Sequence, residues 1–302
     1  MVVSPRQKVL AYAAAARVAQ ACPAPLARSL GAHTGVSASR HVSSMVSRRA
    51  MVARHLRRVY GDDLDAAGLE DKVDETFASY GRYWVESLRL PGTPFPEVDA
   101  GMSWQGIGHI VEATEAGRGC ILALPHLGGW EWAGMWLIQQ GFPMTVVVEA
   151  LDPPELFEWF VSFRRRLGME IVPVGRQAGS AVLRALKANQ VVSLLCDRNI
   201  GDSSGVDVEF FGERTELPGG PATLALRTGA ALLPTAVYFD DELGGHFGLV
   251  RPPLDTTRQA TMRRDVQRLT QELAFALEDL IRRAPSQWHL LQPNWPSDSV
   301  PT

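Results

Sequence analysis

Residues 120–132 read CILALPHLGGWEW, and this stretch decides the fold. Its first five residues are a short apolar run that predicts a buried strand, and the apolar spacing of residues 130–140 predicts a helix. His126 therefore lies where a strand ends and a helix begins. Because ligands bind at the carboxyl ends of strands in open α/β sheets, we expect His126 to face a ligand.

His126 and Glu131 lie five positions apart across a pair of glycines. A neutral imidazole needs a partner on its second ring nitrogen to fix its tautomer, and Glu131 is the nearest candidate in the sequence. Gly128 and Gly129 have no side chains, so their backbone N–H groups can approach a substrate and stabilise developing negative charge. The stretch predicts a general base, although an isolated pattern of this kind is more often a satisfied loop histidine beside a surface glutamate.

Beyond this stretch, apolar runs alternate with helical patterns, which is typical of a largely parallel central sheet flanked by helices. Predicted strands occupy residues 120–124, 144–149, 170–174, 191–196, 206–211, 232–239 and 246–250. Predicted helices occupy residues 6–20, 41–59, 66–89, 130–140, 154–167, 178–188, 220–229 and 257–283. We expect an α/β core at residues 96–302 and a helical, basic N-terminal region at residues 1–95 that packs on it.

The charge of the chain is distributed unevenly. Residues 1–60 contain ten Lys or Arg and no Asp or Glu, whereas the whole chain carries −3, so residues 61–302 carry −13. A basic helical end suggests a surface for anionic lipid, since each basic residue near such a membrane contributes about 1 kcal/mol. The alternatives are nucleic acid, a targeting peptide or a merely solvated helix face, but we find no nucleic-acid recognition motif and no convincing secretory signal.

No stretch approaches the roughly 18–20 apolar residues that are needed to span a bilayer. We therefore expect a peripheral membrane protein. No cluster of His or Cys has the spacing of metal ligands, so no metal is expected.

Several charged residues are expected at the same edge of the sheet as His126. Glu149 ends the second predicted strand, where it can either hydrogen-bond the imidazole in place of Glu131 or shape the substrate pocket. Asp197 and Arg198 end another strand and are candidates for substrate binding, although an adjacent acid and base there more often brace a loop by a salt bridge. Residues 164–166 are three arginines near the end of a helix, so only one or two can face the site, and all of them can simply complement the helix dipole.

The pattern from His126 to Glu131 resembles the His-x4-Asp/Glu motif of glycerolipid and lipid A acyltransferases. Its Gly-Gly-Trp-Glu form is most similar to the lipid A lauroyl/myristoyl branch and its actinobacterial relatives, the phosphatidylinositol mannoside acyltransferases. Further segments resemble the family in family order: residues 163–168 (FRRRLG), 196–199 (CDRN), 205–212 (GVDVEFFG), 233–235 (LPT), 287–289 (QWH) and 294–295 (NW). The resemblance covers residues 100–296, with Asn199 standing where relatives often have a second acid or Gln.

The resemblance implies direct transfer of a fatty acyl group, palmitoyl in the most similar branch, from acyl-CoA to a mannose hydroxyl of an anionic glycophospholipid. His126 would be the base, and Arg164 would bind a phosphate through its guanidinium fork. Trp130 and the aromatic residues after it usually form a core, but beside a catalytic base they can also line a groove for the acyl chain. No cofactor is implied beyond acyl-CoA as co-substrate, and the expected location is the cytoplasmic face of the plasma membrane.

A serine-dependent lipid esterase or thioesterase is the competing interpretation, and a lipid-binding protein without enzymatic activity is a weaker one. Residues 201–205 formally match Gly-x-Ser-x-Gly with Ser203 as nucleophile, and His246 and His289 lie downstream as possible bases. The nucleophile elbow requires a helix directly after the serine, whereas residues 206–211 alternate like a strand. The sequence therefore favours the transferase.

Overall fold

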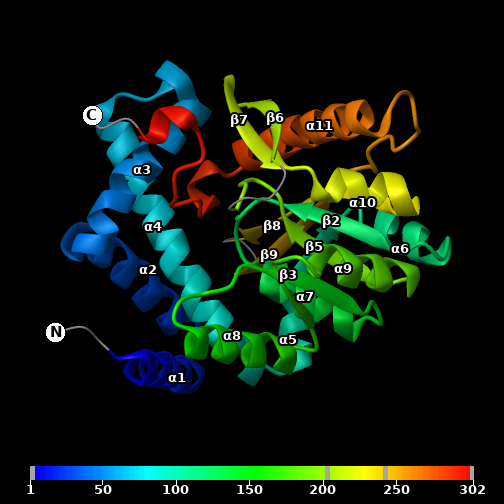
Figure 1. Ribbon diagram of the computed structural model, residues 1–302. Helices are drawn as coiled ribbons and strands as arrows, with labels where there is room; N and C mark the ends of the chain where they lie inside the picture. The colour runs from blue at the N-terminus through cyan, green and yellow to red at the C-terminus, as the bar shows by residue number, and fades with distance from the viewer. Residues whose placement is uncertain (1–3, 201–204, 241–243, 300–302) are drawn as a thin grey trace.

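The computed structural model describes residues 4–200, 205–240 and 244–299. Its centre is a seven-stranded sheet (Figure 1) with the strand order β1-β9-β8-β2-β5-β3-β4. The strands in chain order are β1 (Met102–Gln105), β2 (Cys120–Leu124), β3 (Met144–Val148), β4 (Glu170–Pro173), β5 (Val191–Leu195), β8 (Ala231–Asp240) and β9 (Gly245–Val250). All neighbouring strands are parallel except β8 and β9, which confirms the predicted α/β fold with its largely parallel sheet.

Two layers of helices cover the sheet because successive side chains of a strand point to opposite faces. Ile121 and Ala123 of β2 belong to a core cluster with α9 (Ala178–Lys187), α10 (Gly220–Thr228) and α11 (Met262–Arg282). Leu122 and Leu124 belong to a second cluster, on the other face. That face is covered by α5 (Phe95–Ala100), α6 (Gly108–Glu115), α7 (Trp130–Gln139) and α8 (Pro154–Arg166).

The N-terminal part is a group of four helices beside the sheet (Figure 1): α1 (Pro5–Ala21), α2 (Ala24–His41), α3 (Ser43–Tyr60) and α4 (Ala66–Arg89). Helices α1, α3 and α4 were expected, but α2 was not. Helix α1 contacts α8 of the core, where the rings of Tyr12 and Phe160 lie 5.4 Å apart. No helix among the described residues is both long and apolar enough to cross a membrane.

A separate two-stranded antiparallel hairpin, β6 (Gly205–Phe210) and β7 (Glu213–Pro218), packs against α11 outside the main sheet. Strand β6 was expected, whereas β7 was not. Helix α11 begins at Met262 rather than near residue 257, because the buried carboxylate of Asp265 accepts the backbone N–H groups of Gln259 and Ala260 and holds that stretch as a loop.

The last described segment, residues 285–299, returns to the carboxyl end of β2 and contains two short 3₁₀ helices, η3 (Pro285–Gln287) and η4 (Pro296–Ser299). Its Trp288 forms a β-bridge with Leu127, directly after His126. Figure 1 shows this segment between the N-terminal helices and the β6–β7 hairpin. The chain end therefore lies against the loop that carries the predicted base.

Candidate active site

His126 follows β2 at the carboxyl edge of the sheet, where the sequence placed it. Its Nδ1 lies 2.6 Å from Oδ1 of Asp197, and its backbone N–H donates to Oδ2 of the same carboxylate at 2.9 Å. Asp197 follows β5, the strand next to β2 in the sheet. The side chain of His126 is 27% exposed, whereas that of Asp197 is fully buried. An imidazole bound by a buried acid thus reaches the surface.

Two residues of the C-terminal segment hold Asp197 in place. Trp288 Nε1 donates to its Oδ2 at 2.7 Å, and Asn294 Nδ2 donates to its backbone oxygen at 3.0 Å. Burial alone would raise the pKa of Asp197, but the facing His126 and the hydrogen bonds from His126 and Trp288 outweigh it and leave the pKa below its ordinary value. A charged Asp197 keeps the ring proton on Nδ1, so Nε2 is the nitrogen that can accept a proton.

Glu131 does not make the expected contact with His126. It lies in the first turn of α7, buried, and its Oε1 accepts hydrogen bonds from Tyr83 Oη at 2.9 Å and from Arg164 at 3.1 Å. Glu149 is not the partner of the imidazole either, because it forms an ion pair of 2.7 Å with Arg198. The acid beside His126 comes from the neighbouring strand instead.

Of the three adjacent arginines, Arg164 points inward and Arg165 and Arg166 are exposed. The guanidinium of Arg164 lies over the ring of Trp130, 5.2 Å from its centroid, and is paired with Glu131. Arg198 pairs with Glu149 rather than with its neighbour Asp197, so the expected salt bridge within the loop is replaced by one between β5 and β3.

The two glycines differ in what their N–H groups do. Gly128 has φ +58°, and a Cβ there would lie 1.9 Å from the backbone oxygen of Val237. Its N–H donates to the backbone oxygen of Gln287 at 3.0 Å, so it is not available for a substrate oxyanion. Gly129 is the residue before α7, and the first N–H groups of a helix have no hydrogen-bond partner within the helix.

The sequence profile described as bacterial lipid A biosynthesis acyltransferase matches residues 3–297. The chain belongs to this family. A phosphatidylinositol mannoside acyltransferase of Mycolicibacterium smegmatis is 38% identical over 96% of this chain and 91% of its own length. The protein of that name from Mycobacterium tuberculosis H37Rv is 40% identical over 81% of this chain and 76% of its own length. A lipid A biosynthesis acyltransferase of Haemophilus influenzae is 26% identical over 61% of this chain and 55% of its own length.

The protein is therefore an acyltransferase, and the contact between His126 and Asp197 makes this pair its candidate catalytic dyad. Within the described ranges, no group of three or more His, Cys, Asp or Glu side chains is arranged to hold a metal ion. Ser203, the nucleophile of the competing interpretation, lies outside the described residues.

His289, which the sequence offered as a base for a hydrolase, lies beneath the dyad of the acyltransferase. Its backbone N–H donates to the backbone oxygen of His126 at 2.6 Å, and its Nε2 lies 2.8 Å from Ser79 Oγ on α4. Burial, together with the charge of nearby His126, lowers the pKa of His289 to about 3. His289 is therefore a buried, neutral residue that is hydrogen-bonded to the loop carrying His126.

A second buried histidine, His246, lies behind the start of α7. Its Nε2 is 3.0 Å from Oε2 of Glu86, whose Oε1 also pairs with Arg28 and Arg82. Burial would raise the pKa of Glu86, but His246 and the two arginines lower it to about 2. No local pattern in the sequence predicts this cluster, because its members come from α2, α4 and β9.

Proposed function

We propose that this acyltransferase moves a long fatty acyl group, palmitoyl by resemblance, from acyl-CoA to a mannose hydroxyl of a phosphatidylinositol mannoside. The observation that carries the proposal is the 2.6 Å contact between His126 Nδ1 and the buried Asp197, because it leaves Nε2 as the basic nitrogen of a side chain that is 27% exposed. The names of the M. smegmatis and M. tuberculosis relatives support the glycolipid acceptor.

The proposed reaction is direct transfer. His126 Nε2 takes the proton of the acceptor hydroxyl while its oxygen attacks the thioester carbonyl. N–H groups at the start of α7 stabilise the negative oxygen of the tetrahedral intermediate. When the intermediate collapses, the C–S bond breaks, an ester remains on the acceptor, and the imidazolium returns its proton to the CoA thiolate. Asp197 compensates the positive charge of His126 between these two steps.

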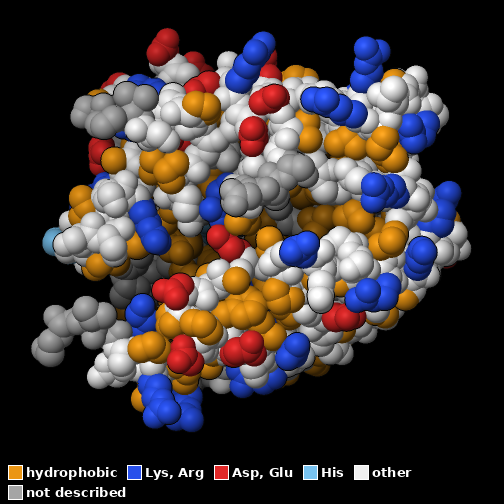
Figure 2. All heavy atoms as spheres, viewed as in Figure 1, with side chains coloured by type: hydrophobic (Ala, Val, Ile, Leu, Met, Phe, Trp, Pro, Cys, Tyr) orange, Lys and Arg blue, Asp and Glu red, His pale blue; other side chains and the backbone are white. Residues whose placement is uncertain are grey.

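Glu131, Arg164 and Trp130 form the wall beside the base. We propose that Glu131 positions Arg164 and the first turn of α7 rather than the imidazole, since its hydrogen bonds go to Arg164 and Tyr83. Phosphate binding by Arg164 remains a proposal from the family resemblance, with Glu131 balancing its charge in the unliganded site. Figure 2 shows a hollow with hydrophobic side chains near the middle of one face, which suits an acyl chain at about 0.8 kcal/mol per buried CH₂.

Glu149 and Arg198 remain proposed substrate contacts. Their ion pair links the ends of β3 and β5, the same edge of the sheet that carries His126. The Glu149 side chain is 43% exposed and that of Arg198 is 15% exposed. An anionic acceptor phosphate can compete with Glu149 for the guanidinium, because Arg binds phosphate through two parallel hydrogen bonds.

We also propose that α1, α2 and the start of α3 bind a membrane surface, at the cytoplasmic face of the plasma membrane. Six large apolar side chains are exposed there: Leu10, Val18, Leu26, Leu30, Val42 and Val46. Arg6, Lys8, Arg17 and Arg48 are exposed on the same helices, and Figure 2 shows hydrophobic and basic side chains side by side on this part of the molecule. Apolar contacts combined with basic charge are typical of interfacial helices.

Several of the basic residues in residues 1–60 form ion pairs with acidic residues of the same protein. Arg28 pairs with Glu86, Arg40 and Arg49 pair with Asp74, and Arg58 pairs with Glu213 and Asp298. The charge available to a membrane is therefore smaller than the +10 of residues 1–60, and the exposed apolar residues carry more of the proposed binding.

Thiol release from palmitoyl-CoA tests the proposed function, measured with and without a mannosylated phosphoinositide. The native protein is expected to release thiol only with the acceptor, and His126→Ala is expected to lose several orders of magnitude in turnover while remaining folded. Ser203→Ala should behave as the native protein. Release without acceptor that disappears with Ser203→Ala would mean a hydrolase, for which neither the family nor the relatives give support.

A further inference from the structure

An open groove of about 400 Å³ lies between the β6–β7 hairpin and the C-terminal segment. Its polar lining comes from Asp207, Arg214 and Glu216 of the hairpin, Asn294 of the C-terminal segment, and Asn199. This volume is within the range of about 300–1,000 Å³ that is usual for small-molecule sites. Apart from Asn294, which donates to the backbone oxygen of Asp197, none of these residues has a part in the proposed acyl transfer.

Two residues of the groove lining, Asn294 and Asn199, lie next to Asp197 of the proposed dyad. The side chain of Asn294 donates from Nδ2 to the backbone oxygen of Asp197 at 3.0 Å. Asn199 lies two residues after Asp197 on the same loop, and its Nδ2 is 3.2 Å from Oε2 of Glu216. Asn294 and Asn199 therefore line the groove and also contact or adjoin the residue that is hydrogen-bonded to His126.

The lining favours one chemical class of ligand. Two carboxylates, Asp207 and Glu216, outweigh the single guanidinium of Arg214, so the groove is net acidic and disfavours the phosphates of a nucleotide. The apolar residues of the lining are Pro293, Trp295 and Pro296, and the polar and charged residues outnumber them, which disfavours an acyl chain. Carboxylates accept hydrogen bonds and amides both donate and accept them, which matches the closely spaced hydroxyl groups of a sugar.

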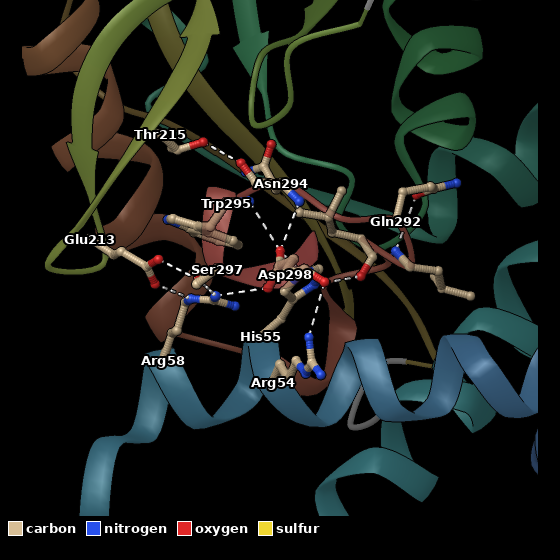
Figure 3. A network of polar contacts seen from close by, with 12 residues as sticks. Arg54, His55, Arg58, Glu213, Thr215, Gln292, Asn294, Trp295, Ser297 and Asp298 are labelled. Atoms are coloured by element: carbon tan, nitrogen blue, oxygen red, sulfur yellow. Dashed lines mark hydrogen bonds and ion pairs between the residues drawn. The ribbon is translucent and has the colours of Figure 1, made fainter. Parts of the chain in front are cut away.

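One wall of the groove is fixed before any ligand binds. Figure 3 shows Asp298 accepting the backbone N–H groups of Asn294 and Trp295, at 2.9 and 3.0 Å, and pairing with Arg58. In the same view the hydroxyl of Thr215 donates to the backbone oxygen of Asn294, which joins the hairpin to the C-terminal segment. A preformed wall reduces the entropy that is lost when a polar ligand is ordered.

We propose that this groove is a carbohydrate subsite, which binds uncharged sugar residues of the acceptor next to the one that is acylated. Asp207 and Glu216 accept hydrogen bonds from sugar hydroxyls, and Asn199 and Asn294 position them toward the dyad. The proposal deepens the proposed function and rests on it for the identity of the acceptor, but binding of the sugar itself can be measured independently.

The first test is kinetic and uses the double variant Asp207→Asn/Glu216→Gln. Because hydrogen bonds to ionised groups are the stronger class, the KM for the mannosylated acceptor should rise about tenfold more than the KM for palmitoyl-CoA. Glu209→Gln is the matched control, since Glu209 is exposed on the same strand and does not line the groove. A change confined to the KM for palmitoyl-CoA would assign the groove to the donor. An equal rise of both KM values would show that the groove binds neither substrate selectively. Either result would overturn the proposal.

The second test needs no acyl transfer. Saturation-transfer NMR with a soluble α-mannobiose should give a signal with the native protein and with Glu209→Gln that is lost or strongly reduced in the double variant. The same signal in all three proteins, or none with the native protein, would overturn the subsite. If the native protein lacks acceptor-dependent thiol release but this sugar signal is present, the proposed function fails while the subsite stands.

Discussion

At the scale of single residues, Glu131 is the side chain whose role the structure changes most. Its buried carboxylate balances the charge of Arg164, and removal of one partner from a buried ion pair costs about 3–5 kcal/mol. We predict that Glu131→Gln lowers the free energy of unfolding in urea by about that amount. Glu149→Gln, which breaks a partly exposed pair, should cost no more than about 1 kcal/mol. Equal losses would contradict a structural role for Glu131.

His289 gives a prediction for the pH dependence of stability. Its pKa is about 3 in the folded protein and near 6.5 in the unfolded chain, so between these values only the unfolded chain binds the proton. Stability should therefore fall as the pH drops from 6.5 toward 3, by up to a few kcal/mol from this group. In His289→Gln this part of the pH dependence should be absent, whereas His33→Gln, at an exposed position, should keep it. Identical pH profiles for native protein and His289→Gln would refute the assignment.

The sequence located the base but not its acid, for a physical reason. His126 is recognisable from a local pattern: an apolar strand, a glycine pair and a helix. The acid depends on which strands are neighbours, and β5 lies beside β2 although β3 and β4 come between them in the chain. Glu131, close to His126 in sequence, has its carboxylate bound by Tyr83 and Arg164 instead, and Asp197, 71 positions after His126, contacts the imidazole.

At the scale of helices and strands, the expected elements were those with clear apolar periodicity. Helix α2 escaped prediction because its contact with α4 depends on glycines rather than on large apolar residues. A Cβ at Gly35 would lie 2.1 Å from the backbone oxygen of Phe77, and one at Gly81 would lie 2.0 Å from that of Gly31. Glycine is usually a sign against a helix, but here it lets two helices approach closely. Strand β7 was missed because its residues are mainly polar, and only its pairing with β6 reveals it.

The exposed apolar side chains of α1–α3 give a prediction about membrane binding. Leu26 and Leu30 lie one turn apart on α2 and are both exposed. We predict that Leu26→Ser/Leu30→Ser weakens binding to anionic phosphatidylinositol vesicles at least about tenfold at both low and high salt, since burial of one such side chain contributes about 1.5–3 kcal/mol. Arg6→Gln/Lys8→Gln should weaken it mainly at low salt.

The control for this experiment is Phe275→Ser, which removes an exposed apolar side chain from α11, a helix outside the N-terminal group. It should bind vesicles as the native protein does. If Phe275→Ser weakens binding as much as the double change on α2, the N-terminal helices are not the membrane surface.

At the scale of the whole molecule, residues from both ends of the chain meet at Asp298 (Figure 3). Its fully buried side chain pairs with Arg58 and contacts His55, both on α3. Burial would raise the pKa of Asp298, but the hydrogen bonds from His55, Asn294 and Trp295 and the pair with Arg58 lower it far below its ordinary value. This contribution to stability is therefore present above pH 4 and is lost as the pH falls below it.

We predict that Asp298→Asn lowers the free energy of unfolding at pH 7 by about 3–5 kcal/mol, because it leaves Arg58 without its buried partner. It should also lower kcat, since the same segment holds Asn294 and Trp288 on Asp197. Asp279→Asn, in an exposed ion pair with Arg251, should change neither quantity measurably. An Asp298→Asn protein of native stability would show that the contacts between Asp298 and α3 do not stabilise the protein.

The most direct test of the account is the kcat of Asp197→Asn in acceptor-dependent thiol release, compared with that of Glu131→Gln in protein shown to be folded. If Asp197 fixes the tautomer of His126, the asparagine variant should lose on the order of 10³–10⁴ in kcat, as when the acid of a catalytic His–Asp pair is replaced, with little change in either KM. A near-native kcat in Asp197→Asn, or a larger loss of kcat in Glu131→Gln, would contradict the assignment of Asp197 as the acid that orients the base.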